Sequence, residues 1–425
     1  MSGQHRSGAS GQHRLAPSPE LLRQWRVVRW LLAAVVGSLA FGSWWFVASA
    51  STPTAAKPPA KSGGMAGNWP AGSTAAPPVT AAATLAEPSP TRQPLGNLTL
   101  TASGPGKLVA GSDPRDLPRP LLISDEHNNR LLIIDRDGRT MWEFPRKGDL
   151  AAGQTFKSPD DAYFTPDGNQ IISTQGDDNV ISVIDIASRK IVYTFGKSGQ
   201  TGSGPDRLFG PDDAMMLPNG DIVASDISNC RIIMIPKGGH AVIRQIGRTG
   251  VCQHSPQNLG APSGAFPMMN GNYLVSEIKG GWVSEMNLSG QVLWSTKVPT
   301  VAYITDPNEI SKDRYLTVDY SNPGQVVTFN RAGKVLWRYA PTGEMALNKP
   351  SQAMPLPNGN YMVADRGNHR LIIVAPGNKA VLWQYGHTGV AGKDPGYLNY
   401  PTGMDFLPPD SLLVKHGASM GKIPS

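Results

Sequence analysis

The sequence predicts an all-β protein: a six-bladed β-propeller preceded by an N-terminal transmembrane helix and a disordered linker. Three observations carry this prediction. They are a unit that recurs along most of the chain, short β-rich runs separated by Asn, Gly and Pro turns, and a single long apolar segment near the N-terminus. The 425 residues include 47 Gly and 38 Pro, a content that suits many tight turns and disfavours a helical bundle or a coiled coil.

The N-terminal part of the chain predicts a membrane anchor. Residues 1–29 form a short polar head that we expect to be disordered in the cytoplasm. Residues 30–50 contain no charged side chain and are about as long as the ~20 residues that a helix needs to cross a bilayer. Arg23, Arg26 and Arg29 precede this segment, so the N-terminus is expected in the cytoplasm and the rest outside it, as in a single-pass cell-membrane protein.

The alternative to an anchor is a secreted protein cleaved near Ala50. Ala48-Ser49-Ala50 matches the small-residue pattern of a signal-peptidase site. The apolar run is longer than the ~7–15-residue core of a signal peptide. An uncleaved signal anchor, with the lipid bilayer as the partner of residues 30–50, is therefore the favoured interpretation.

Composition divides the remaining chain. Residues 51–96 are rich in Ala, Pro, Ser, Thr and Gly and are expected to form an extended linker, because they cannot bury enough apolar surface to fold. Residues 97–417 are expected to form the propeller, and residues 418–425 a tail. The net charge is +7, but five arginines stand against one glutamate in residues 1–29 alone. The charge therefore does not indicate nucleic-acid binding.

The repeated unit begins with a leading proline, at positions 159, 211, 262, 307, 350 and 401. The intervals of 43 to 52 residues match the blade of a propeller. In the third unit the expected strands are 214–217, 222–225, 231–235 and 241–246. The turn Pro218-Asn219-Gly220 connects the first two, because Asn and Gly accept the backbone conformation that such turns require.

Closure of the ring follows from the two ends of the repeat region. The first unit, residues 119–144, lacks a first strand, and residues 401–407 supply one at the other end of the chain. Six blades closed by the C-terminal strand leave no open sheet edge. Residues 411–415 also look like a strand, so a seventh blade completed by residues 98–111 is the alternative. Trp142, Trp294, Trp337 and Trp383 recur at one position of the fourth strand, which predicts packing between blades.

A polar element follows the second strand of several units. It reads Asp-x-x-Asn-x-Arg at Asp125–Arg130, Asp226–Arg231 and Asp365–Arg370. Together with the Gly-x-x-Gly, Leu-x-x-Pro and Asn-Gly elements, it resembles the NHL-repeat β-propellers over roughly residues 107–415. We place Thr174 and Glu277 at the Asp position of the second and fourth units. The resemblance implies a closed propeller but no particular activity, because this fold hosts many functions.

Two features are expected on the face that carries the loops after each second and fourth strand. Cys230 and Cys252 both map to this face and are expected to form a disulfide, because loop closure across their separation is favourable and the domain is expected outside the cytoplasm. The two residues after each leading proline are expected at the mouth of the central channel. They give as candidate ligand-binding residues Asp160, Asp161, Asp212, Asp213, Asn308, Glu309 and Gln352.

Within this set, Asp161, Asp213 and Glu309 are the candidate metal ligands. Carboxylates held close together need a counter-charge, and their oxygens suit Ca²⁺. No other cofactor is expected, and the sequence does not identify catalytic residues.

The predicted function is a binding or sensing module for a protein, a glycan or a small ligand on the loop face. The alternative is a propeller enzyme, a hydrolase, a lyase or a sulfotransferase-like protein, with its site at the channel mouth. NHL-type lyases bind a metal through clustered histidines, and propeller sulfotransferases use a catalytic histidine near the axis, which the Pro-Asp-Asp-Ala segments lack. The two hypotheses therefore differ in one feature. An enzyme would bring a loop histidine or arginine within hydrogen-bond reach of Asp161 and Asp213.

Overall fold

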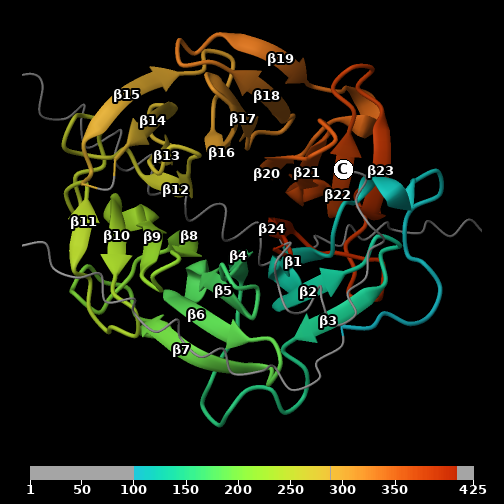
Figure 1. Cartoon of the computed structure of the whole chain (residues 1–425), viewed down its shortest axis with the longest axis horizontal. Helices are drawn as coiled ribbons and strands as arrows, with labels where there is room; N and C mark the ends of the chain where they lie inside the picture. The colour runs from blue at the N-terminus through green and yellow to red at the C-terminus, as the bar shows by residue number, and fades with distance from the viewer. Residues whose placement is uncertain (1–99, 288, 409–425) are drawn as a thin grey trace, which may run out of the picture. The chain divides into compact units, whose positions relative to one another are not determined.

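The computed structural model describes residues 100–287 and 289–408. They form six antiparallel sheets of four strands each, arranged as a ring around a central axis (Figure 1). The predicted all-β six-bladed propeller is confirmed. The only helices in these ranges are three-residue 3-10 turns, and none of them could span a membrane. The predicted anchor at 30–50, the linker at 51–96 and the tail at 418–425 lie outside the described residues.

Each blade runs from an inner strand at the axis to an outer strand at the rim. Blade one contains β24 (Pro401–Phe406), β1 (Leu121–Asp125), β2 (Arg130–Ile134) and β3 (Thr140–Phe144). Blade two contains β4 (Pro159–Phe164), β5 (Gln170–Gln175), β6 (Val180–Asp185) and β7 (Lys190–Gly196). Blade three contains β8 (Pro211–Met216), β9 (Ile222–Asp226), β10 (Arg231–Ile235) and β11 (Arg244–Ile246).

The other three blades follow the same order. Blade four contains β12 (Pro262–Pro267), β13 (Tyr273–Glu277), β14 (Trp282–Met286) and β15 (Val292–Lys297). Blade five contains β16 (Ile304–Ser311), β17 (Arg314–Asp319), β18 (Gln325–Phe329) and β19 (Val335–Tyr339). Blade six contains β20 (Pro350–Pro355), β21 (Tyr361–Asp365), β22 (Arg370–Val374) and β23 (Val381–Gly386).

The ring closes through the C-terminal strand, as predicted. Strand β24 pairs antiparallel with β1, so one blade joins the two ends of the repeat region. Residues 100–111 form no strand. They belong to a segment that runs beside β23, where the Val109 amide donates to the Gln384 carbonyl at 3.1 Å. The seventh-blade alternative is therefore wrong for this part of the chain, and residues 411–415 lie outside the described residues.

The core consists of six apolar clusters, one between each pair of neighbouring blades. The recurrent tryptophans belong to these interfaces. The indole N–H of Trp142 donates to the Ile186 carbonyl of blade two, and that of Trp383 donates to the Arg136 carbonyl of blade one. The prediction that these tryptophans pack between blades is confirmed.

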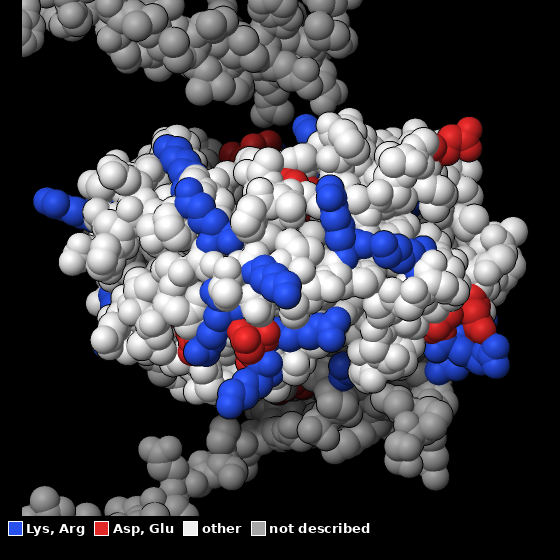
Figure 2. Space-filling model, turned by 90° about the horizontal axis from the view of Figure 1, so that it is seen from above, with Lys and Arg blue, Asp and Glu red and all other residues white. Residues whose placement is uncertain are grey.

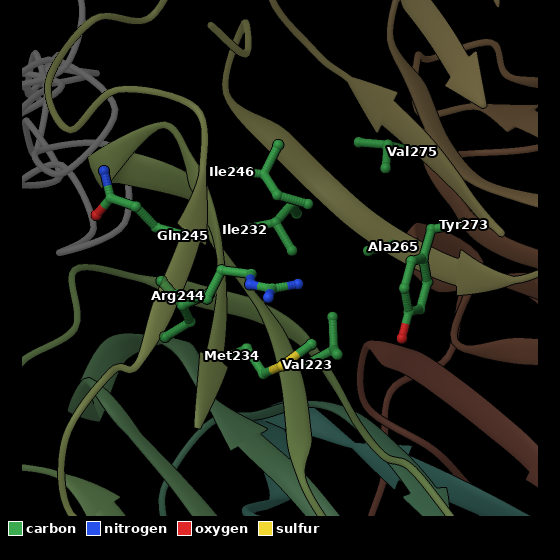
Figure 3. A pocket seen from close by; sticks show the side chains of 10 residues that line it. Val223, Ile232, Met234, Arg244, Gln245, Ile246, Ala265, Tyr273 and Val275 are labelled. Carbon is green, nitrogen blue, oxygen red and sulfur yellow. The ribbon is translucent and has the colours of Figure 1, made fainter. Parts of the chain in front are cut away.

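The interface between blades three and four contains a small cavity. It measures about 20 Å³ and is lined mainly by apolar side chains of the two sheets, with Arg244 among them (Figure 3). The strand register explains the gap. Arg244 pairs with Met234 in blade three, and Trp142 pairs with the equivalent Ile133 in blade one, so Arg244 and Trp142 occupy the same position of the fourth strand. An arginine therefore stands where four other blades carry tryptophan. A space of this size holds about one water molecule, so we regard it as a packing defect.

Cys230 and Cys252 form the predicted disulfide, with their Cα atoms 5.1 Å apart. This separation lies within the ordinary range for a bridged pair. Cys230 ends the turn after β9, and Cys252 lies in the connector after β11. The bridge ties together two loops of the same face.

Candidate functional site

The channel mouth lies on the face formed by the turn after each second strand and the connector before each inner strand. Residues from both kinds of loop line its cavities, including Glu126, Ile227 and Arg366 from turns and Ser158 and Phe209 from connectors. The inner strands begin at this face, and in all six blades the ladder register shifts near their start. Such bulges re-aim side chains. They therefore bring the residues after each leading position to the channel.

The register corrects the predicted alignment of blade five. In blade six the leading Pro350 pairs with Asp365. In blade five Asp319 is equivalent to Asp365, and it pairs with Ile304. Pro307 is therefore not the leading position, and Asn308 and Glu309 are not the counterparts of Asp160 and Asp161. The counterparts in blade five are Thr305 and Asp306.

A second correction concerns blade two. Pro159 pairs with Gln175, so Gln175, and not the predicted Thr174, occupies the Asp position of this blade. Gln175 donates to the Ser182 hydroxyl at 2.7 Å, a neutral contact in place of the ion pair found in other blades. The hydroxyl of Thr174 has a different role and donates to the Asp212 carbonyl.

Two rings of residues surround the channel once this alignment is used. The first residue after each leading position forms the mouth ring, which comprises Thr402, Asp160, Asp212, Ser263, Thr305 and Ser351. The second residue forms the channel ring, which comprises Gly403, Asp161, Asp213, Gly264, Asp306 and Gln352. In the mouth ring, Thr305 donates to the Ser351 carbonyl at 2.9 Å and Ser351 donates to the Thr402 carbonyl at 2.8 Å. Side-chain hydroxyls therefore connect successive blades at the mouth.

Five carboxylates from three blades meet in these rings. Oxygens of Asp160, Asp161 and Asp212 lie within 4.8 Å of one another, and so do oxygens of Asp161, Asp213 and Asp306. Asp160 and Asp212 are half-buried. Asp161, Asp213 and Asp306 are only 6%, 2% and 5% exposed. Asp161 belongs to both groups and connects them.

The electrostatics of the cluster disfavour full ionisation. Burial, followed by the charge of Asp213, raises the pKa of Asp161 well above its usual range. Burial and the neighbouring Asp306 do the same for the pKa of Asp213. Burial and Asp161 raise the pKa of Asp212 to about 8. Carboxylates held this close repel one another unless a proton or a cation compensates their charge.

Two cavities open at the mouth ring, and both reach Asp160 and Asp212. One measures about 360 Å³ and extends toward blades two and three, and the other measures about 200 Å³ and lies over the axis. Carboxylates contribute to the larger one through Glu126, Asp160, Asp177 and Asp212. The larger cavity alone falls within the range of small-molecule sites.

One ion pair borders the mouth. The Arg366 guanidinium donates to the Glu126 carboxylate and to the Tyr320 hydroxyl, the latter at 2.6 Å. It also lies 4.6 Å from the ring centre of Tyr400. This arginine is held by Glu126 and by two aromatic rings, and it lines the smaller cavity, whereas its partner Glu126 lines the larger one.

The other predicted site residues lie around the cluster rather than in it. The Glu309 carboxylate accepts from the Met269 amide at 2.8 Å, and the Asn308 amide donates to the Ala353 carbonyl at 3.0 Å. Glu309 thus belongs to neither acidic group. Gln352 is buried in the channel ring and donates to the Tyr163 hydroxyl at 3.3 Å.

Tyr163 and Asp306 are the members of the site that sequence reasoning missed. The Tyr163 hydroxyl donates to Asp213 at 2.5 Å, which connects Asp213 to Gln352. Asp306 precedes Pro307 and has a φ of 45°, like Ser158 before the leading Pro159, so Pro307 resembles a leading position and hides the role of Asp306.

The recurrent Asp-x-x-Asn-x-Arg element is structural. In blade six, Asp365 accepts from Arg370 and Asn368, each at 2.8 Å, and from the Asn348 amide at 2.8 Å. The equivalent aspartates of blades one and three accept from Arg and Asn in the same way. In these three blades the motif therefore fixes the turn after the second strand and the connector before the inner strand.

Arg366 is the arginine that lines the smaller mouth cavity. Lys and Arg are spread over the outer rim that Figure 2 shows. Among the residues that line the larger mouth cavity there is neither Lys nor Arg. The positive net charge of the chain therefore does not describe its channel.

Comparison with known proteins agrees with this architecture. Residues 240–394 match the family model described as outer membrane protein assembly factor BamB. The chain is a β-propeller with a BamB-like segment. No curated protein matches the sequence.

Several solved structures are similar to this chain. A protein of unknown function from Bacteroides caccae is 18% identical, with 68% of this chain and 99% of that chain covered and a TM-score of 0.48. A streptogramin B lyase is 15% identical, with 73% and 89% covered and a TM-score of 0.48. A chain of the nidogen/laminin complex is 13% identical, with 69% and 99% covered and the same TM-score. Similarities at this level carry no argument about activity or ligand.

Proposed function

We propose that this protein is a membrane-anchored, extracytoplasmic binding module of the NHL-repeat type whose channel mouth takes a small organic cation. The observation that carries the proposal is the larger mouth cavity, in which several carboxylates converge and no Lys or Arg side chain lines the wall. Glu126 is already paired with Arg366, and an ammonium group would supply the counter-charge that Asp160 and Asp212 need.

The apolar part of the cavity fits the same class of ligand. Phe209 is 45% exposed and lines the cavity together with Ile227. A hydrocarbon chain can pack on these side chains, and a cation can lie over the face of an aromatic ring. The mouth therefore suits an amine with a short aliphatic body.

The enzyme alternative has less support. It required a loop histidine or arginine at Asp161 and Asp213. Within residues 100–287 and 289–408, neither carboxylate is hydrogen-bonded to such a side chain, and Asp213 is bonded to the Tyr163 hydroxyl instead. Of the loop histidines, His127 and His369 pack against Tyr400, with ring centres 4.2 Å and 4.9 Å apart. We therefore favour binding over catalysis.

The proposal is tested with three probes of equal chain length. Calorimetry on the full chain in detergent should show binding of 1,4-diaminobutane, and no binding of neutral 1,4-butanediol or of anionic succinate. Asp160→Asn should weaken diamine binding about 10-fold, the value of one lost charged contact of ~1.4 kcal/mol. Glu344→Gln removes the same charge from an exposed site and should leave binding unchanged. Absence of diamine binding, or equal binding of the diol, would refute the proposal.

The anchor has its own test. The full chain should stay with membranes during alkaline extraction, because a transmembrane helix holds it there. Release of a chain whose N-terminus lies near Ser51 would show cleavage and secretion instead.

A further inference from the structure

The channel ring combines three aspartates with two glycines and one glutamine. In blade order it reads Gly403, Asp161, Asp213, Gly264, Asp306 and Gln352, and it is therefore neither uniformly acidic nor uniformly apolar. Two adjacent carboxylates have a glycine on either side, and a third carboxylate comes from blade five.

The two glycines leave the space that these carboxylates occupy. A Cβ atom at Gly403 would overlap Oδ1 of Asp161, and a Cβ atom at Gly264 would overlap Oδ2 of Asp213. Any larger residue at these positions would displace the carboxylates. Each aspartate therefore depends on a glycine of the neighbouring blade for its place.

The same two oxygens are buried without a hydrogen-bond partner. Oδ1 of Asp161 and Oδ2 of Asp213 have none, although each residue is more than nine-tenths buried. A buried carboxylate oxygen without a donor costs free energy comparable to a lost charged hydrogen bond. In native proteins such oxygens are usually paired with a donor or coordinate a metal ion.

We propose that Asp161, Asp213 and Asp306 bind one divalent cation of the Ca²⁺ class. One ligand oxygen from each residue lies within 4.8 Å of the other two, so a single point lies no more than about 2.8 Å from all three, which is compatible with the 2.3–2.6 Å of Ca²⁺–oxygen bonds. Mg²⁺ demands a stricter octahedral geometry and gives up its water ligands reluctantly. We therefore expect this buried site to favour Ca²⁺ over Mg²⁺.

Hydrogen bonds through Tyr163 and Gln352 hold Asp213 in place. Tyr163 donates to the other oxygen of Asp213, and Gln352 accepts from the Met404 amide at 2.8 Å and donates to Tyr163. These bonds fix the orientation of Asp213 in the way that outer-shell partners orient metal ligands. Asp160 and Asp212 remain on the mouth side, from which an ion would enter.

The cation site lies next to the amine site proposed above, with Asp161 common to both acidic groups, so its test uses the metal alone. The full chain in detergent is treated with a chelator and titrated with CaCl₂ by calorimetry. One ion per chain is expected, with MgCl₂ binding at least about 10-fold more weakly. Asp213→Asn and Asp306→Asn should each weaken CaCl₂ binding at least about 10-fold.

Controls separate loss of the site from loss of the fold. Each Asn variant is first melted without metal, where it should be at least as stable as the wild type because a repulsive buried carboxylate is removed. Glu344→Gln should bind CaCl₂ as the wild type does. No CaCl₂ binding by the wild type would overturn the proposal. So would binding that Asp212→Asn weakens and Asp306→Asn does not, since that result places the ion in the mouth-side group. Diamine binding and CaCl₂ binding are measured separately. Either proposal can therefore fail while the other holds.

Discussion

The buried pair of Asp365 and Arg370 gives the most direct test of the structural role of the repeated polar motif. Both side chains are 0% exposed, and the Arg370 Nε lies 2.8 Å from Oδ2 of Asp365. Arg370 also donates to the Thr388 hydroxyl at 2.9 Å. Arg370→Met would keep the aliphatic stem but leave a buried carboxylate without its counter-charge.

The expected loss is large because removing one partner of a buried ion pair costs about 3–5 kcal/mol. For a domain of this size the corresponding fall in Tm is about 10 °C. The assay is thermal melting of the purified chain followed by circular dichroism, with Arg338→Met as the control. Arg338 is an exposed arginine of β19, so its replacement should change stability by no more than ~0.5 kcal/mol.

A double variant separates lost charge compensation from lost packing. Asp365→Asn combined with Arg370→Met should recover part of the lost stability, since no unpaired buried charge remains. Diamine and CaCl₂ binding should survive in Arg370→Met below its melting temperature. A change of 1 kcal/mol in the free energy of unfolding shifts the Tm by about 2–4 °C. A Tm for Arg370→Met within 2 °C of that for Arg338→Met would therefore refute the structural interpretation.

Three further predictions concern the disulfide, the cavity and pH. Cys230→Ser should lower the free energy of unfolding by about 2–4 kcal/mol and make Cys252 reactive toward a thiol reagent in the native protein; two reactive thiols in the native wild type would contradict the bridge. Arg244→Trp should raise the free energy of unfolding by about 1 kcal/mol, because the indole can fill the cavity between blades three and four, and an unchanged or lower Tm would count against the register argument. Burial raises the pKa of Asp405 from 3.8 to about 7, so the stability it contributes is complete below pH 3.8 and is lost as the pH rises through 7. The wild type should therefore lose about 2 kcal/mol relative to Asp405→Asn between pH 5 and 8, and parallel curves in urea melts at several pH values would show that Asp405 is not responsible.

The sequence predicted the features that are encoded by short local patterns within each blade. Strand positions in blade three agree to within a few residues, and the closure through residues 401–407 is confirmed, because turns, β-rich runs and a missing first strand are local signals. The Cys230–Cys252 pair could also be predicted, since both residues map to loops of one face.

The sequence did not predict correctly which residue of blade five is the leading one, because that depends on how two strands pair. Asp306 before Pro307 has the positive φ that Ser158 has before Pro159, so the local signature of a leading position occurs three residues after the true one. Pairing of Ile304 with Asp319 is a property of two strands and cannot be read from one. The convergence of Asp306 with Asp161 and Asp213 needs the closed ring, which brings blades two, three and five to a common axis.

The location of a bound ion tests the central claim, that the channel carboxylates form the functional site, most directly. Crystals of the protein grown with MnCl₂ would report it by anomalous diffraction, since Mn²⁺ takes the same kind of carboxylate ligands as Ca²⁺. The account predicts one strong peak among the carboxylates of Asp161, Asp213 and Asp306. A map with no peak in the channel, or with its peaks only at exposed carboxylates of the rim, would contradict it.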